Sequence, residues 1–454
     1  MKPKNNFEII AARIEREMKR LRVPGVSLGI YHNGKERTAG FGATSVENPL
    51  PVTPDTLFQI GSISKTFTAT ALMMLAEQGK LHLDAPVRKY IKDFKLKDEN
   101  TAKKVTTRHL LTHTGGWVGD YFNSFGDGDD ALARMVKDIA KLPQIQPLGK
   151  IWSYNNTGFN IASRIIEVVT KKPYEQALQE MLLDPLGLNM SFMYPNDILF
   201  THRFVVGHQK IKGKVEVARP WAIGRAGNGV GGVVSTVKDL LKYARFHMGN
   251  GNKIIQRKSL RAMRVKQFGA GGRGDMGIAW FIRYAGDLIA YAHGGATHGQ
   301  QAYFFFIPEK DFALAILTNS DDGGIIGAQM FNATLALYFG IKLETPKPMM
   351  NPQDRSEFIG RYKIGAECFD ITTKGKYLVY HHIPLGGFPT PDTPPGPALA
   401  PMRFAFYDED HLVGLDEPFN GALADVLRDE KGRVKYFRVG GRAHLKIRRN
   451  STAR

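Results

Sequence analysis

Cysteine and long apolar runs are the features that this sequence has least of. Its 454 residues include a single cysteine, Cys368, so no intrachain disulfide can form and a reducing compartment is compatible with the chain. No stretch of about 18 uncharged apolar residues occurs, which argues against a membrane-spanning helix. The charged N-terminus also lacks the apolar core of a signal peptide. These absences favour a cytoplasmic protein without a membrane partner.

Acidic residues are also in deficit. Asp and Glu number 43 against 62 Lys and Arg, which gives a formal charge of +19 and a pI near 9.7. Such an excess raises the hypothesis of nucleic-acid binding. However, the basic residues are scattered and often stand beside acids, as in KYIKDFKLKDENTAKK at residues 89–104, and no zinc-finger spacing, basic helix pair or RNP-like aromatic motif accompanies them. The sequence therefore favours a solvated basic surface, suited to anionic substrates, over a nucleic-acid site.

Length and composition divide the chain into two predicted domains, residues 1–345 and 346–454. A chain of this length is too long for one ordinary core. Residues 342–356 are rich in proline and polar residues, as linkers are. Beyond them, short strand-like runs separated by turns are typical of a small antiparallel barrel or sandwich. Within this second domain, the proline-rich segment Gly386 to Met402 is long enough to reach another subunit or the active site.

The first domain is predicted to combine one sheet with helices. Apolar residues on one side of the N-terminal segment predict an amphipathic helix, and Asn33-Gly34 marks the turn of a hairpin over residues 25–42. Two more hairpins are predicted over residues 276–295 and 300–320, followed by a helix over residues 323–341, whereas residues 83–250 are predicted to be helices and loops. The fold class is therefore α+β, an antiparallel sheet flanked by helices with an all-helical subdomain beside it. The apolar residues of the N-terminal helix are Phe7, Ile9, Ile10, Ile14 and Met18.

The stretch FQIGSISKTFTATALMMLAEQGKL, residues 58–81, predicts a strand end, a turn at Gly61 and a nearly all-apolar helix. Ser62 and Lys65 stand three residues apart and so share one face of that helix. Burial and the positive potential at a helix N-terminus lower the pKa of a lysine, and a neutral amine can accept the proton of a serine hydroxyl. The same residues also occur in ordinary capped helices with an exposed lysine. Alone, the pair is a weak signal.

Two later segments supply polar residues that would complete a cleft. Tyr154 and Asn156 precede a predicted helix, where the phenol would share a proton with the serine and lysine and the amide would hold a substrate carbonyl. Residues 293–296, His-Gly-Gly-Ala, end a predicted strand whose glycines let a substrate backbone approach, with His293 as a third wall. The alternatives are a polar loop that caps the helix and a structural histidine.

Together, these three elements resemble the SxxK, Y-x-N and third-motif segments of the serine β-lactamase and penicillin-binding-protein class. The resemblance is closest to the group of class C β-lactamases, DD-peptidases and esterases with an H-x-G third motif. It covers about residues 8–340 and extends to the stretches His109 to Gly116 and Gly229 to Phe246.

The resemblance implies a role for each motif residue. Ser62 is expected to be the acylated nucleophile, with Lys65 and Tyr154 as the base system that relays its proton and later activates water. The backbone N–H groups of Ser62 and Ala296 are expected to form the oxyanion hole. His293 would replace the usual lysine and hydrogen-bond Tyr154 or a substrate carboxylate. The substrate-binding residues are expected to be Asn156, His293, Gly294 and Gly295, and no cofactor is expected.

Four other residues are assigned structural roles. His109 and His113 stand four residues apart, which suits a metal, but no HExxH glutamate accompanies them and the segment matches a structural stretch of the family. We therefore expect no metal. Ser64 is expected to pack at the helix start, and Cys368 is expected to be a small core residue rather than a nucleophile.

Acyl transfer through a serine ester is the activity that the resemblance implies, and it leaves the substrate open. The C-terminal domain resembles the lipocalin-like domains of archaeal and bacterial peptidases of this group, notably those that act on D-amino-acid peptides. Histidine in place of the third-motif lysine weakens the fixed cation for a β-lactam carboxylate. We therefore expect a serine hydrolase of small peptides or amides, in particular D-amino-acid-containing peptides, with esterase side activity.

Two alternatives to this function stay open. One is a carboxylesterase or weak β-lactamase. The other is a non-catalytic penicillin-binding or scaffold protein, against which the intact Ser62, Lys65, Tyr154 and Asn156 argue. For partners, the C-terminal domain suggests a homo-oligomer.

Overall fold

The computed structural model describes residues 5–201, 203–221, 223–249, 251–348, 355–387, 390, 392–396, 398–417 and 420–447. An eight-stranded antiparallel sheet has the order β2-β1-β12-β11-β10-β9-β8-β7. The N-terminal hairpin joins the late hairpins through the pairing of β1 with β12, so both ends of the first domain build one sheet, as predicted. Its strands are β1 (Gly25–His32), β2 (Lys35–Gly42), β7 (Phe268–Gly269), β8 (Asp275–Met276), β9 (Phe281–Ala285), β10 (Leu288–Thr297), β11 (Gln300–Ile307) and β12 (Phe312–Thr318).

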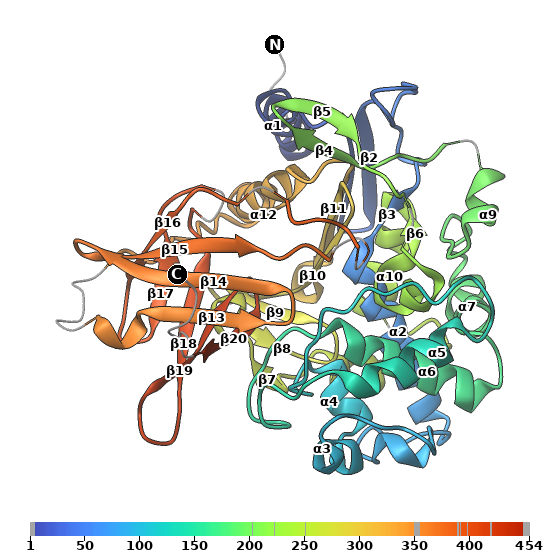
Figure 1. Cartoon of the computed structure of the whole chain (residues 1–454). Coiled ribbons are helices and arrows are strands. Elements are labelled where there is room, and N and C mark those ends of the chain that lie inside the picture. The colour runs from blue at the N-terminus through green and yellow to red at the C-terminus, as the bar shows by residue number, and fades with distance from the viewer. Residues whose placement is uncertain are drawn as a thin grey trace.

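Helices cover both faces of this sheet because its central strands alternate apolar side chains between two cores (Figure 1). Phe305 and Ile307 of β11 pack with the first pair of helices, α1 (Asn6–Leu21) and α12 (Gly323–Phe339). Phe304 and Phe306 pack with the second set, α2 (Ser64–Glu77), α10 (Val237–Met248) and α11 (Arg257–Met263). The predicted helices at residues 7–18 and 323–341 are therefore both present.

A helical region lies beside the sheet, between α2 and α10 in the chain. Its helices are α3 (Glu99–Lys104), α4 (Thr107–Leu111), α5 (Ala131–Asp138), α6 (Asn156–Thr170), α7 (Tyr174–Leu178), α8 (Asp184–Leu186) and α9 (Pro195–Leu199). Short helical turns are η1 (Gly61–Ile63), η2 (Val87–Lys89), η3 (Ile139–Lys141), η4 (Gln179–Leu183), η5 (Arg225–Gly227), η6 (Asn228–Gly232), η7 (Gly271–Arg273), η8 (Pro308–Lys310) and η9 (Ser356–Phe358). No helix in the described part of the chain is long and apolar enough to span a bilayer.

The region between α2 and α10 is not wholly helical, which corrects the prediction for residues 83–250. A two-stranded hairpin of β4 (His208–Ile211) and β5 (Lys214–Val217) turns at Lys212-Gly213, where both residues have positive φ. Strand β6 (Val234–Ser235) pairs with the earlier β3 (Phe58–Gln59), the strand that leads into α2.

The C-terminal strands close into an eight-stranded antiparallel barrel, which decides between the predicted barrel and sandwich. Closure comes from the pairing of the first strand with the last, and aromatic side chains such as Phe369 and Phe437 fill the interior. Part of the predicted linker, residues 349–354, lies outside the described residues, and the domain boundary at 345/346 stays a prediction. The barrel strands are β13 (Gly360–Ile364), β14 (Glu367–Lys374), β15 (Tyr377–Pro384), β16 (Met402–Phe406), β17 (His411–Gly414), β18 (Leu423–Arg428), β19 (Val434–Val439) and β20 (Arg442–Ile447).

Candidate active site

The turn between β3 and α2 places Ser62 at the start of the buried helix. Gly61 has a φ of +51°, and a Cβ built on it would lie 2.6 Å from the backbone nitrogen of Ala296. Only glycine fits this left-handed and crowded position without strain. The helix that follows is buried on nearly every side, so Lys65 in its first turn has no exposed surface.

Lys65 has two polar contacts within this apolar setting. Its Nζ lies 2.8 Å from the Ser62 Oγ and donates to the Val230 carbonyl oxygen at 2.8 Å. Burial holds the pKa of the Lys65 amine well below its usual range, and the positive charge of Arg442 lowers it further, whereas Asp120 opposes the shift. An uncharged amine beside a serine hydroxyl is a general base in hydrogen-bonding reach of its proton.

Tyr154 is the third member of this group. Its phenol hydrogen-bonds Ser62, and the Lys65 Nζ lies 5.1 Å from the centre of its ring. Burial raises the pKa of Tyr154 to about 12, an effect that the hydrogen bond to Ser62 partly offsets. At neutral pH the phenol is therefore protonated while the Lys65 amine is the group inclined to be neutral. This difference favours Lys65 as the base and Tyr154 as the group that passes a proton on.

Strand β10 passes directly against the turn that carries Ser62. A Cβ built on Gly295 would lie 1.8 Å from the Ile60 carbonyl oxygen, so this position admits no side chain. The close approach brings the backbone of Ala296 next to Gly61, the residue before Ser62. The two backbone N–H groups predicted for the oxyanion hole thus come from segments in direct contact.

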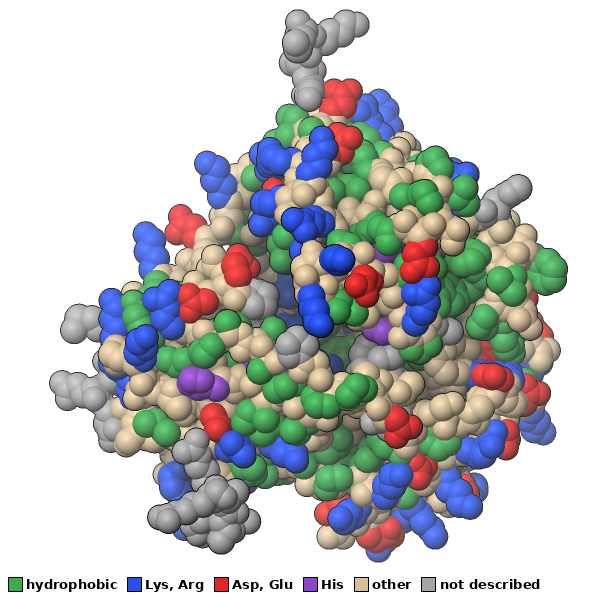
Figure 2. Space-filling view, turned by 45° about the horizontal axis from the view of Figure 1, so that its top comes forward, with side chains coloured by type: hydrophobic (Ala, Val, Ile, Leu, Met, Phe, Trp, Pro, Cys, Tyr) green, Lys and Arg blue, Asp and Glu red, His purple; other side chains and the backbone are tan. Residues whose placement is uncertain are grey.

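A cavity of about 940 Å³ opens in front of these residues, and Ser62, Tyr154, Asn156 and Ala296 line it. Figure 2 shows a hollow near the centre of one face of the molecule, with hydrophobic side chains around it. Along β10, side chains alternate between buried and exposed, and His293 is buried rather than part of the cavity lining. Gly294 and Gly295 are likewise absent from that lining.

The His293 ring lies behind Tyr154, with 6.3 Å between the ring centres, and packs on Phe281. Its Nδ1 lies 2.6 Å from the Gly294 carbonyl oxygen. Burial lowers the pKa of His293 to about 3, so the ring is neutral at physiological pH. A neutral ring provides no fixed cation for a substrate carboxylate.

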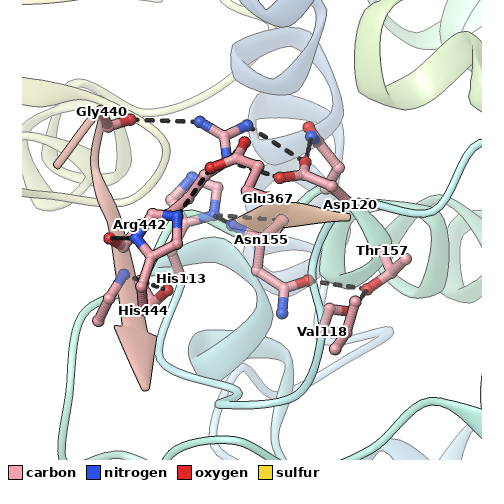
Figure 3. A network of polar contacts seen from close by, with 12 residues as sticks. His113, Val118, Asp120, Asn155, Thr157, Glu367, Gly440, Arg442 and His444 are labelled. Atoms are coloured by element: carbon pink, nitrogen blue, oxygen red, sulfur yellow. Dashed lines mark hydrogen bonds and ion pairs between the residues drawn. The ribbon is translucent and has the colours of Figure 1, made fainter. Parts of the chain in front are cut away.

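A chain of polar contacts runs from Asn156 into the barrel, and Figure 3 shows its members Asp120, Arg442, Glu367 and His444. The Asn156 Nδ2 donates to the Asp120 Oδ1 at 2.5 Å, and the Arg442 Nε of β20 donates to the Asp120 Oδ2 at 2.5 Å. The same Nε lies 3.2 Å from Glu367, whose other oxygen lies 3.0 Å from the His444 Nε2. Desolvation disfavours the Glu367 charge, but Arg442 and His444 hold the pKa of this carboxyl below its usual range.

The turn between β19 and β20 also holds the backbone of the Tyr154 segment. The Tyr154 N–H donates to the Gly441 carbonyl oxygen at 2.9 Å, and the Ala443 N–H donates to the Ser153 Oγ at 3.1 Å. Sequence reasoning missed this contribution of the barrel, including Arg442. Asp120 and Arg442 are 322 residues apart, and neither stands in a motif that signals the contact.

His113 was assigned a structural role, and the structure places it against the site. Its ring stacks on the Tyr154 ring with 4.3 Å between centres, and its Nδ1 accepts from the Asn155 N–H at 3.0 Å. Burial keeps the pKa of His113 well below its usual range. His109 instead contacts the Thr106 hydroxyl at 2.8 Å in the cap of α4, so the two histidines have separate partners.

Ser64 and Cys368 have the environments that were predicted for them. The Ser64 Oγ donates to the Gly61 carbonyl oxygen at 2.7 Å and accepts from the Val233 N–H at 3.1 Å, which joins the helix start to the η6 segment. Cys368 is buried in β14, and burial raises the pKa of its thiol, which makes a thiolate nucleophile unfavourable.

Known proteins resemble this chain in both sequence and fold. Residues 10–330 match the Beta-lactamase family. Penicillin-binding protein 4 of Amycolatopsis lactamdurans is 30% identical over 75% of this chain and 93% of its own length. The crystal structure of SurE with D-Leu superposes with a TM-score of 0.75 at 23% identity over 97% of this chain and 99% of that one. The octameric penicillin-binding protein homologue from Pyrococcus abyssi has a TM-score of 0.63 at 25% identity over 97% and 100%.

Proposed function

Because the chain belongs to the beta-lactamase family and is a serine hydrolase, we propose that Ser62 forms an acyl-enzyme with small peptides or amides, in particular peptides that contain D-amino acids. The observation that carries the assignment of Ser62 is its contact with the buried Lys65 amine at 2.8 Å. Burial makes this amine a base, and the contact makes Ser62 the hydroxyl that it activates.

The proposed reaction has two steps. In the first, the Ser62 Oγ bonds to the substrate carbonyl carbon while its proton moves to the Lys65 amine. The backbone N–H groups of Ser62 and Ala296 stabilise the oxyanion, a contribution of roughly 3 kcal/mol per donor in enzymes of this kind. Tyr154 then donates a proton to the leaving amine or alkoxide as the bond to it breaks, and regains one from Lys65. In the second step, a water oxygen bonds to the acyl carbon while the Lys65 amine accepts a proton from the water. The bond from that carbon to the Ser62 Oγ then breaks, the proton returns to the Ser62 Oγ, and the acid leaves.

Asn156 is proposed to hold the amide of the acyl group. One N–H of its side chain is committed to Asp120, which fixes the plane of the amide and leaves the second N–H for a substrate carbonyl. Asp120 is in turn fixed by Arg442 through both of its oxygens. Arg442 is thus a positioning residue for Asn156, supplied by the barrel.

Two observations support the proposed substrate class. D-Leu accompanies SurE in its crystal structure, and SurE shares the fold of nearly the whole chain. The neutral His293 gives a β-lactam carboxylate no fixed cation, which disfavours efficient hydrolysis of β-lactams.

A ranking of substrates tests this proposal. Specificity constants are measured for D- and L-aminoacyl peptides and amides, p-nitrophenyl esters and nitrocefin, each with the wild-type protein and with Ser62→Ala. We expect D-configured peptides or amides to rank first and Ser62→Ala to lose turnover of every substrate. If nitrocefin exceeds all peptides and esters by orders of magnitude, the proposed substrate class is wrong. If Ser62→Ala keeps near wild-type ester hydrolysis, the assignment of the nucleophile is wrong.

We also propose that the chain assembles into a homo-oligomer through its C-terminal barrel. The support is the octameric state named for the Pyrococcus abyssi homologue, which matches 97% of this chain. Light scattering on the full chain should give a mass that is a multiple of 50.5 kDa. A mass of one chain at micromolar concentration would remove this proposal.

A further inference from the structure

The cavity continues from Ser62 into a chamber with apolar walls from two parts of the chain. We define the apolar chamber by the aliphatic residues that line it. The helical region contributes Val118, Met135, Leu142 and Ile145, and the barrel contributes Ile364, Leu385, Leu445 and Ile447. The mechanism above uses none of these side chains.

The barrel wall of the chamber is fixed rather than loosely apposed. Residues 443, 445 and 447 share one side of β20 because side chains alternate along a strand. The Ala443 N–H donates to the Ser153 Oγ and its carbonyl oxygen accepts from the Gln146 Nε2 at 2.7 Å, so the start of β20 is bound to the first domain. Leu445 lies opposite Tyr436 in the pairing of β19 with β20, so it shares the side of Tyr436. The Tyr436 hydroxyl donates to the Ile145 carbonyl oxygen at 3.1 Å and ties the two walls together.

Three charged residues of the cavity lining are already paired. Asp120 and Glu367 each pair with Arg442, and Glu367 also contacts His444. An ionic group of a substrate would have to break these pairs, whereas an apolar group would enter without that cost. The charge pattern therefore favours an apolar occupant.

Size and position indicate which part of the substrate this occupant is. The whole cavity, with the part next to Ser62 included, has a volume of about 940 Å³, which is near the upper end of the roughly 300–1,000 Å³ range of ligand pockets and exceeds what a single small amino acid amide fills. Asn156, which the proposed mechanism assigns to the amide of the acyl group, is joined through Asp120 to β20 of the barrel wall. The acyl side of the substrate is thus the part that continues toward the chamber.

We propose that the chamber binds a bulky apolar group on the acyl side of the substrate and that the barrel makes the enzyme selective for such groups. This inference rests on the proposed function, since it concerns the group that Ser62 acylates. Apolar side chains of a short peptide and a medium-length aliphatic acyl chain present the same chemistry to these walls. A single small residue would leave most of the chamber unfilled.

A series of p-nitrophenyl esters from acetate to hexanoate tests the proposal, because only the acyl chain changes. Each methylene that becomes buried should raise kcat/KM about threefold to fourfold, so hexanoate should exceed acetate by at least tenfold. In Leu445→Trp, which fills the chamber from β20, hexanoate should lose at least tenfold while acetate stays within about twofold of the wild type. Ile359→Trp is the matched control, because Ile359 is an exposed barrel residue outside the cavity lining.

A second arm separates the two sources of the apolar group. Short D-peptide p-nitroanilides with leucine side chains are compared with their serine counterparts in the same three proteins. If kcat/KM is higher for the leucine peptides than for the serine peptides and Leu445→Trp removes this difference, the ligand is a peptide. If kcat/KM rises only along the ester series, the ligand is an aliphatic acyl chain. Either result supports the proposal. A flat response in both series, or equal losses for acetate and hexanoate in a folded Leu445→Trp, would overturn it. Hydrolysis of the acetate ester is also compared between the wild type and Ser62→Ala. If this hydrolysis depends on Ser62, the proposed function holds even where the proposed chamber fails.

Discussion

Replacing Arg442 with methionine removes the guanidinium that links the barrel to the candidate active site. In the wild type this group meets Asp120 with two nitrogens, at 2.5 and 3.2 Å, and Glu367 at 3.2 Å. Only 22% of the Arg442 side chain and 17% of the Asp120 side chain are exposed, so water replaces little of what is lost. Methionine keeps an aliphatic stem of similar length and so limits the loss of packing.

The size of the effect follows from these contacts. A hydrogen bond to a charged group contributes about 1.5–3 kcal/mol, and its loss releases Asp120 and with it the plane of the Asn156 amide. If the transition state loses this interaction energy in full, kcat/KM falls about 10- to 150-fold. The pH profile should change as well. Arg442 lowers the pKa of Lys65 and Asp120 raises it, so removing Arg442 leaves the effect of Asp120 unopposed and raises that pKa. The acid limb of kcat/KM should therefore move to higher pH.

The assay measures kcat/KM for a p-nitrophenyl ester between pH 5 and 10 in Arg442→Met, Asp120→Asn and the double variant. If Arg442 acts through Asp120, the double variant should lose less than the two single losses combined. Arg361→Met is the matched control, because Arg361 forms the same forked pair with Asp370 in the same barrel and does not line the cavity. A folded Arg442→Met with near wild-type activity and an unshifted profile would refute this reasoning, as would an equal loss in the control.

Three further predictions concern the groups around Ser62. Gly295→Ala should lower kcat more than tenfold, because its Cβ would lie 1.8 Å from the Ile60 carbonyl oxygen. Gly294→Ala, whose Cβ has its nearest contact at 3.5 Å, should keep a kcat close to that of the wild type. Equal effects of the two variants in steady-state assays would contradict the role of close packing at Gly295. Tyr154→Phe keeps the ring that stacks on His113 but lacks the hydroxyl that donates a proton to the leaving group. The kcat should therefore fall about 100-fold, which is within the range of general acid–base catalysis. Retained turnover would show that Tyr154 does not transfer this proton. In the wild type, kcat/KM should rise with pH as the Lys65 amine loses its proton. Because the pKa of this amine is lowered, the plateau should be reached well below the ordinary lysine pKa of about 10.4. A profile that keeps rising up to about pH 10 would contradict a depressed pKa.

Local patterns predicted most of the fold. The Asn33-Gly34 turn, with φ of 49° and 76°, and the hairpin over residues 300–320 are properties of short segments, and the sequence shows both. The β4–β5 hairpin was missed although Lys212-Gly213 adopts the same left-handed turn, because the flanking strands are short and largely exposed. Closure of the barrel depends on the pairing of β13 with β20, a contact between chain ends that strand patterns alone leave open.

The sequence motifs point to Ser62, Lys65 and Tyr154, which the structure brings into contact, and their catalytic roles stay predictions. The helix at residues 64–77 does bury Lys65, since nearly all of its residues, from Ser64 to Leu75, are buried. His293 differs from the expected cleft wall, since alternation along β10 turns its ring inward and exposes residues 294 and 296 instead. Arg442 could not be found, because its role arises from a contact across 322 residues between parts of the chain without shared motifs. Long-range packing of this kind leaves no local signal.

Formation of an ester on Ser62 is the most direct test of the central claim. The protein is mixed with a p-nitrophenyl ester, quenched in acid within the first turnovers, and analysed by intact mass and by peptide mapping. The account predicts a mass increase equal to one acyl group, located on the peptide that contains Ser62, and no such adduct in Ser62→Ala. An adduct on another residue, or turnover of the same ester by Ser62→Ala at the wild-type rate, would contradict it.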